Sequence, residues 1–141
     1  MYEIIVEDSF SAAHFLKLYD GSWEHRHGHD WKVAVAAEAN KLDSMGVVLD
    51  FEMLKSALKQ VLSRLHLTSL NEHPRFKKTG VNSSTENIAG LIYDELSKKI
   101  TSKTARITKV TVWETPDACA SYKPTPPDPL FKKRGGGNFA H

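Results

Sequence analysis

The fold is decided by the stretch HGHDWKVAVAAE, residues 27–38, which opens on two histidines and continues in small and β-branched residues. We predict a strand from His29 to Glu38. The residues from Tyr2 to Phe10 alternate in polarity and are rich in Ile and Val, so they predict another strand, which can extend to His14. Turn-forming residues lie between Phe15 and Glu24, so the two strands are expected to form a long hairpin.

Two helices are predicted after the hairpin. Asp50 is placed to cap the first helix, whose apolar residues follow at helical spacing: Phe51, Leu54, Leu58, Val61, Leu62 and Leu65. Ser83 and Glu86 have the spacing of a capping box at the start of the second helix. Its apolar residues are Ile88, Leu91, Ile92, Leu96 and Ile100. Each helix therefore has one apolar stripe with which to cover a sheet.

Two further strands are predicted, from Arg106 to Glu114 and from Ala118 to Tyr122. The order ββααββ indicates an α+β domain, in which an antiparallel four-stranded sheet carries two helices on one face. We expect this domain to span residues 1–123. Residues 124–141 are rich in proline and glycine and are expected to form a C-terminal tail.

The composition excludes several classes of function. The formal net charge of +2 and a pI of about 8.6 are too mildly basic to indicate a nucleic-acid partner. The apolar runs are too short to span a membrane, and the N-terminus lacks the pattern of a signal peptide. Cys119 is the single cysteine, so an intrachain disulfide is excluded, and it is expected to be a small buried residue. A cytoplasmic protein is the default expectation.

Three histidines are candidate metal ligands. In His27–Gly28–His29 the imidazoles are two residues apart, so on a strand they project from the same face. His14, on the neighbouring strand of the hairpin, can supply a third nitrogen. Three imidazoles with one open position form the usual catalytic zinc site, in which Zn²⁺ polarises an oxygen of the substrate. The alternative is a group of surface or core histidines without a metal.

Several motifs occur in the same order as in one family. They are Phe10–Ser11–Ala12–Ala13–His14, His27–Gly28–His29, Val48–Leu49–Asp50–Phe51, Leu70–Asn71–Glu72, Ser84–Thr85–Glu86–Asn87–Ile88–Ala89 and Val112–Trp113–Glu114–Thr115. The set resembles the 6-pyruvoyltetrahydropterin synthases and their bacterial relatives, the 6-carboxytetrahydropterin synthases. The resemblance covers roughly residues 2–122.

The resemblance implies a tunnelling fold (T-fold) and a hexamer built from two trimers, with active sites between subunits. It implies 7,8-dihydroneopterin triphosphate or a close analogue as the small-molecule substrate and Zn²⁺ on its side-chain oxygens. Glu114, with Thr115 beside it, would bind the pterin, because a carboxylate pairs with the donor edge formed by the 2-amino group and ring N–H. The alternative for Glu114 is a surface ion pair. Queuosine and folate biosynthesis both stay open as pathways.

The chain departs from the family at its proton-transfer residues. The usual cysteine base is replaced by Trp23, and the usual Asp-His pair by His66 and Leu67. Glu24, three residues before His27, resembles a subgroup that carries Glu-x-x-His-Gly-His and makes 6-hydroxymethyl-7,8-dihydropterin, a folate precursor. Glu24 is therefore the candidate general base, with a solvated loop residue as the alternative.

Other residues near the motifs have candidate roles. His66 and His25 are candidates for shuttling protons. Arg26 and the basic run Lys132–Lys133–Arg134 are candidates for neutralising a triphosphate. Two further hypotheses stay open: a non-catalytic pterin- or purine-binding homologue that retains the zinc site, and a family member with a different substrate.

Overall fold

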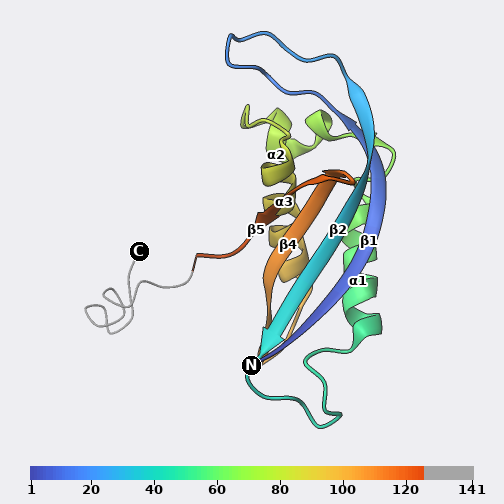
Figure 1. Ribbon diagram of the computed structural model, residues 1–141, viewed down its shortest axis with the longest axis vertical. Helices are drawn as coiled ribbons and strands as arrows, with labels where there is room; N and C mark the ends of the chain where they lie inside the picture. Colours follow the sequence, from blue (N-terminus) through green and yellow to red (C-terminus); the bar gives the residue numbers. More distant parts are fainter. Residues whose placement is uncertain (126–141) are drawn as a thin grey trace, which may run out of the picture.

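The computed structural model describes residues 1–125 of the chain, and Figure 1 traces its elements. In chain order they are β1 (Tyr2–His14), β2 (His27–Ala39), α1 (Phe51–Ser63), β3 (Thr68–Ser69), a 3₁₀ turn (Leu70–Glu72), α2 (Pro74–Lys77), α3 (Thr85–Ser97), β4 (Ala105–Thr115) and β5 (Ala118–Tyr122). The two predicted helices and the four predicted strands are therefore present. The short elements between α1 and α3 were not predicted, because segments of two to four residues are too brief to display a period.

The strands form one five-stranded sheet in the order β3-β1-β2-β4-β5. Antiparallel pairing joins β1 to β2, β2 to β4 and β4 to β5, which confirms the four-stranded antiparallel sheet. The added strand, β3, pairs in parallel with β1 and makes the sheet mixed. Leu67, just before β3, has a left-handed φ of 59° and donates its N–H to the Ser11 carbonyl at 2.6 Å. This turn brings β3 to the edge beside β1.

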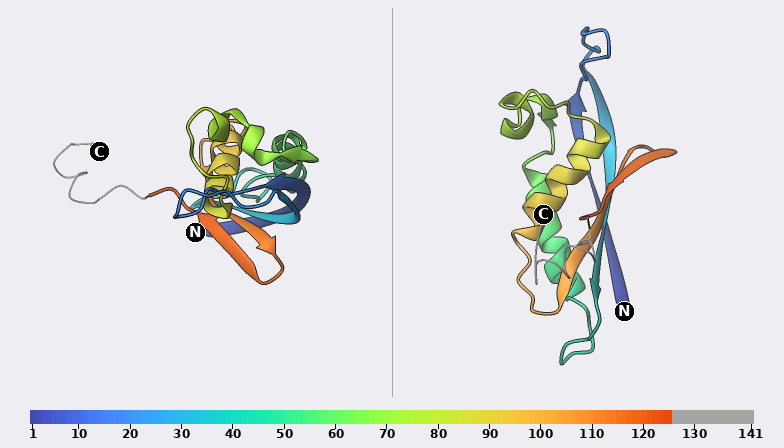
Figure 2. Two further views of the ribbon diagram at one scale, coloured as in Figure 1. Left: turned by 90° about the horizontal axis from the view of Figure 1, so that it is seen from above. Right: turned by 90° about the vertical axis from the view of Figure 1, so that its left-hand side faces the viewer.

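The helices all cover one face of the sheet, as both views in Figure 2 show. The hydrophobic core lies between this face and the helices and includes Trp31, Val33 and Val35 of β2. From α1 it receives Leu54, Ala57, Leu58, Val61 and Leu62, and from α3 Ile88, Ala89, Leu91, Ile92 and Leu96. Phe51 was assigned to the apolar stripe but is 53% exposed, because it lies at the first position of α1, where the chain enters the helix from solvent.

One helix cap was predicted correctly and the other one residue too early. The Asp50 side chain accepts the Glu52 N–H at 2.8 Å and caps α1, as expected. The cap of α3 is Ser84, whose hydroxyl accepts the Asn87 N–H at 3.2 Å. Ser83 is instead fully buried and bonded away from the helix. Either of the two adjacent serines could cap the helix by sequence. Ser83 is engaged in buried tertiary contacts, so Ser84 is the cap.

Two further expectations concern the C-terminal part of the chain. Cys119 is exposed rather than buried, because it lies on β5, the edge strand of the sheet. The predicted tail, residues 124–141, lies almost entirely outside the described residues, and so do Lys132, Lys133 and Arg134. Within residues 1–125 no helix is long and apolar enough to cross a membrane.

Candidate metal centre

The three predicted ligands come together at one end of the β1–β2 hairpin. His14 is the last residue of β1 and pairs with His27, the first residue of β2, while His29 pairs with Ala12. The antiparallel register puts the three imidazoles on the same face of the sheet. One nitrogen from each ring lies within 4.8 Å of the others. The arrangement can therefore hold a single metal ion.

Hydrogen bonds to backbone carbonyls fix two of the three rings. His14 Nδ1 lies 2.7 Å from the Ser83 carbonyl oxygen, and His27 Nδ1 lies 2.8 Å from the His25 carbonyl oxygen. Since a carbonyl only accepts, each Nδ1 carries the proton in the neutral ring and each Nε2 keeps a lone pair. This orientation of ligand histidines by an outer hydrogen bond is common at metal sites.

The centre also contains buried nitrogens that lack a partner. Within the described residues, the Nε2 atoms of His14 and His29 are buried and make no hydrogen bond. Such orphaned polar atoms are costly in a folded protein. A divalent cation would satisfy both lone pairs at once, so the residues present fit a metal. Zinc accepts this ligand set, three imidazole nitrogens with a fourth position left open.

His14 is held in the protonation state that a metal requires. Its side chain is 1% exposed, and burial lowers its pKa below 6.5. The hydrogen bond to Ser83 and the Glu114 carboxylate oppose this shift, while His27 and His29 reinforce it. Burial has the largest effect, because it disfavours the charged ring. The neutral ring, with a free lone pair, is therefore the favoured form near neutral pH.

Glu114 lies beside the metal centre. Its Oε1 is 3.4 Å from His14 Nε2 and 4.0 Å from His29 Nε2, and its side chain is 33% exposed. The Thr85 hydroxyl, at the start of α3, donates to the same oxygen at 3.3 Å. Thr115 points elsewhere, because its hydroxyl donates to Asp117 in the β4–β5 turn at 2.8 Å. Of the two residues assigned to substrate binding, the structure thus places Glu114 next to the histidines.

Trp31 packs beneath the cluster and was not recognised as a site residue. Its ring is fully buried and meets the rings of His14 and His29 edge-on, with centroids 4.9 and 5.2 Å apart. Its Nε1 donates to the Ala12 carbonyl at 3.1 Å. The spacing that linked His27 to His29 continues to residue 31, so the strand period contained the signal for this residue.

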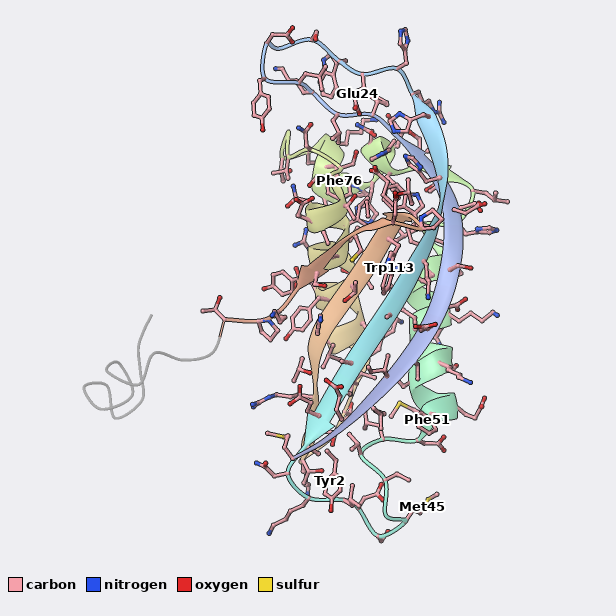
Figure 3. The ribbon with its side chains drawn as sticks, in the orientation of Figure 1. Tyr2, Glu24, Met45, Phe51, Phe76 and Trp113 are labelled. Atoms are coloured by element: carbon pink, nitrogen blue, oxygen red, sulfur yellow. The ribbon has the colours of Figure 1, made fainter. Side chains whose placement is uncertain are left out.

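The two candidate catalytic residues, Glu24 and His66, lie in different parts of the fold. Figure 3 shows Glu24 on the loop that joins β1 to β2. Its Oε1 accepts the Leu16 N–H at 2.9 Å, and its own N–H donates to the Leu16 carbonyl, also at 2.9 Å. His66 is exposed after the end of α1, and its Nδ1 accepts the Ser11 N–H at 3.1 Å. Within one chain, the structure does not group His66 with the three histidines.

A surface cavity has His29 in its lining but neither His14 nor His27. It measures about 400 Å³, and its lining includes Arg26, Asp30 and Thr68. The Ser11 hydroxyl, also in the lining, donates to Asp30 Oδ1 at 2.5 Å. A volume of this order suits a small organic ligand. Arg26, which was predicted to meet phosphate, is the cation in this lining.

Comparison with known proteins relates the chain to pterin enzymes. A family model described as 6-pyruvoyl tetrahydropterin synthase matches residues 3–125. The chain is 32% identical over 111 residues to the dihydroneopterin monophosphate aldolase of Pyrococcus furiosus, which covers 79% of this chain and 88% of that protein. It is 30% identical over 142 residues to the 6-carboxy-5,6,7,8-tetrahydropterin synthase of Bacillus subtilis, which covers 97% and 90%.

A solved structure supports the same relationship. The Caenorhabditis elegans 6-pyruvoyl tetrahydropterin synthase matches the fold with a TM-score of 0.76 at 27% identity. The match covers 88% of this chain and 96% of that one. The expected α+β T-fold is thereby confirmed.

Proposed function

The chain belongs to the 6-pyruvoyl tetrahydropterin synthase family, and on that premise we propose that it is a zinc-dependent pterin lyase. The substrate is 7,8-dihydroneopterin triphosphate or a close analogue such as the monophosphate, and Glu24 is the general base. The observation that carries the proposal is the convergence of three imidazole nitrogens, two of them buried without a partner, beside the Glu114 carboxylate.

His14, His27 and His29 would hold the zinc ion. When bound, zinc polarises the oxygens of the substrate side chain and makes their protons more acidic. The chain holds its ligand rings in place before the metal arrives, since two of the three Nδ1 atoms are bonded to carbonyls. Little reorganisation is then needed when the metal binds.

Glu114 would orient the pterin. A carboxylate accepts two hydrogen bonds side by side, which matches the paired donors of the 2-amino group and the neighbouring ring N–H. The Thr85 hydroxyl bonds to Glu114 Oε1 and restricts the rotation of the carboxylate. Thr115 would contact the substrate only by exchanging the bond from its hydroxyl to Asp117 for a bond to the pterin.

Glu24 would take the proton whose removal starts the cleavage. Breaking the carbon–carbon bond of the side chain requires loss of a hydroxyl proton and return of a proton to the carbon that stays on the pterin. The Leu16 N–H occupies Glu24 Oε1, so Oε2 is the oxygen offered to the substrate. The aldolase of Pyrococcus furiosus, whose name describes this kind of cleavage, supports 6-hydroxymethyl-7,8-dihydropterin as the product.

The assembly and location are part of the same proposal. We infer a hexamer made of two trimers, with active sites between subunits, in the cytoplasm. His66 lines a surface cavity of about 230 Å³ together with Lys59 and Leu62, away from the ligands of its own chain. A proton-transfer role for His66 therefore requires the site of a neighbouring subunit.

The test is turnover by zinc-loaded protein. The protein is incubated with 7,8-dihydroneopterin triphosphate and, separately, with the monophosphate, and the pterin products are identified by mass spectrometry. We expect 6-hydroxymethyl-7,8-dihydropterin from at least one of them. Recovery of both substrates unchanged would contradict the proposal.

A second candidate function is pterin binding without catalysis. Two observations favour it: both Glu24 hydrogen bonds to Leu16 serve the loop itself, and Trp23 stands where the family has its cysteine. It predicts that a dihydropterin binds with high affinity and is recovered unchanged. Turnover that is lost in Glu24→Gln would rule it out.

A further inference from the structure

The proposed chemistry leaves Asn71, in the 3₁₀ turn after β3, without a role. Its side-chain amide makes three hydrogen bonds to two other parts of the chain. Oδ1 accepts the Phe15 N–H at 3.0 Å and the Ser83 hydroxyl at 3.0 Å, while Nδ2 donates to the Phe15 carbonyl at 2.8 Å. The amide is held in one orientation, because a flip would put a donor against each donor and an acceptor against the carbonyl.

Two of these bonds hold the backbone directly after a metal ligand. Phe15 follows His14, at which the pairing of β1 with β2 ends. The Asn71 amide accepts from the Phe15 N–H and donates to its carbonyl, as a neighbouring strand would. The peptide that carries His14 is therefore fixed on both sides, by β2 before it and by Asn71 after it.

The third bond of Asn71 holds the group that orients the His14 ring. The Ser83 carbonyl accepts from His14 Nδ1 at 2.7 Å, and Ser83 is completely buried. Its hydroxyl donates to Asn71 Oδ1. Asn71 therefore holds both the backbone next to His14 and the residue whose carbonyl orients the His14 ring.

We propose that Asn71 is the positioning residue of the metal centre, which holds His14 in ligating geometry through Phe15 and Ser83. The inference rests on the proposed function, because it takes the three histidines to be metal ligands. It predicts that a change at Asn71 weakens metal binding although Asn71 supplies no ligand atom. Loss of a partner that bonds directly to a ligand typically costs about 10- to 100-fold in metal affinity, and Asn71 acts through such a partner, Ser83.

The chain contains a matched control for this test. Asn82 makes the same pair of bonds with the backbone of Lys17, accepting its N–H and donating to its carbonyl, each at 2.9 Å. In both Asn71→Asp and Asn82→Asp the donor is lost and the acceptor is kept. Asn82 is the chain neighbour of Ser83, but its side chain bonds to Lys17, whereas the Asn71 side chain bonds to Phe15 and to Ser83 itself. Damage to the loop alone therefore affects both variants, and loss of positioning through the side chain affects Asn71→Asp.

The experiment measures zinc affinity of the full-length protein by competition with a chromogenic chelator. Cobalt(II) absorption reports the geometry of the ligands. We expect Asn71→Asp to bind zinc about 10- to 100-fold more weakly, with an altered cobalt spectrum, and Asn82→Asp to stay within about threefold of the wild type. Equal affinities and spectra for the two variants would overturn the inference while leaving the proposed function intact.

Two further outcomes are also decisive. A wild-type protein that binds no zinc would overturn the proposed function and this inference together. If Asn71→Asp does not fold, Ser83→Ala replaces it, because it removes the bond to Asn71 and fits the same buried space. We then expect zinc affinity weaker than that of the wild type, together with an altered cobalt spectrum. An unchanged affinity and cobalt spectrum would contradict positioning through Ser83.

Discussion

The metal ligands and the candidate base lie close together in the sequence but are held in different ways. His14 and His27 face each other in the β1–β2 register, and each ring is oriented by a backbone carbonyl. Glu24 lies on the loop of residues 15–26, where the Lys17–Trp23 bridge and the Leu16–Glu24 pair join the two arms of the loop. The bonds from this loop to Asn71 and Asn82 are made by Phe15 and Lys17, not by Glu24. Tyr19 and Trp23 on this loop are exposed.

Because of this difference, the position of the site depends on the sheet, and the proposed reaction depends on the loop. A sheet fixes side chains by its register, so the side chains at positions 23 and 24 of the loop can change while the three histidines stay in place. A loop tolerates replacement more readily and carries specificity. In the proposed function, Trp23 therefore replaces the family cysteine and Glu24 takes the proton-transfer role without disturbing the metal centre.

Removing one of the three histidines is expected to have the largest effect. We expect His29→Ala to lower zinc affinity by more than about 100-fold, since losing even an outer partner of a ligand costs about 10- to 100-fold. His66→Ala, which changes an exposed histidine outside the cluster, should keep wild-type affinity. Equal zinc content in the two purified variants would show that the cluster does not hold the metal.

A change at Glu114 tests the pterin side of the centre. In Glu114→Gln the amide keeps the shape but loses the charge and one acceptor, so we expect dihydropterin affinity to fall by about 10- to 100-fold, a typical value for hydrogen bonds to a charged group. Zinc content should stay close to one ion per chain. Titration of the zinc-loaded protein with a dihydropterin gives the affinity, and an unchanged dissociation constant would exclude Glu114 as the anchor.

Trp31→Phe tests the contribution of the tryptophan that packs beneath the histidines. The smaller ring loses the hydrogen bond from Nε1 to the Ala12 carbonyl and leaves part of a fully buried space unfilled. We expect the free energy of unfolding to fall by about 1–3 kcal/mol. Trp113→Phe is the control, because Trp113 is half-buried on the other face under the Lys32 ammonium group. Urea unfolding of both metal-free variants should separate them; equal losses would contradict the role of Trp31.

The smallest effect is expected at His73, which caps α2 by accepting the Arg75 N–H on Nδ1 at 3.1 Å. Burial lowers the pKa of His73 below 6.5, with Glu95 opposing and Arg75 assisting. The pKa is lower in the folded state, so this contribution to stability is present above pH 6.5 and is lost as the pH falls through the folded-state pKa.

His73→Asn keeps a capping acceptor that does not titrate in this range. We therefore expect the wild type to lose up to about 1 kcal/mol more stability than His73→Asn between pH 7.5 and pH 5, a value typical of a helix cap. Urea unfolding across this range measures the difference. Parallel stability curves would contradict the assignment. Because His14 titrates in both proteins, its contribution cancels in the comparison.

The sequence predicted the long elements and the convergence of the three histidines, because both follow from periodicity. The alternation up to His14 and the spacing from His27 to His29 are local patterns. Pairing of the two strands then brings the three side chains together. The contacts of Asn71 and Ser83 could not be predicted in this way, since Ser83 meets His14 across 69 positions of the chain. Because the same long-range contacts engage Ser83, the cap of α3 is Ser84 and not the predicted Ser83.

In the proposed function the strands hold the metal while Glu24 on the loop performs the proton transfer. The most direct test measures zinc content and product formation together in Glu24→Gln. We expect one zinc ion per chain, as in the wild type, and cleavage of the dihydroneopterin phosphate slowed by about 10²- to 10⁴-fold, the usual contribution of a general base. Cleavage at the wild-type rate, or loss of the zinc, would contradict this separation.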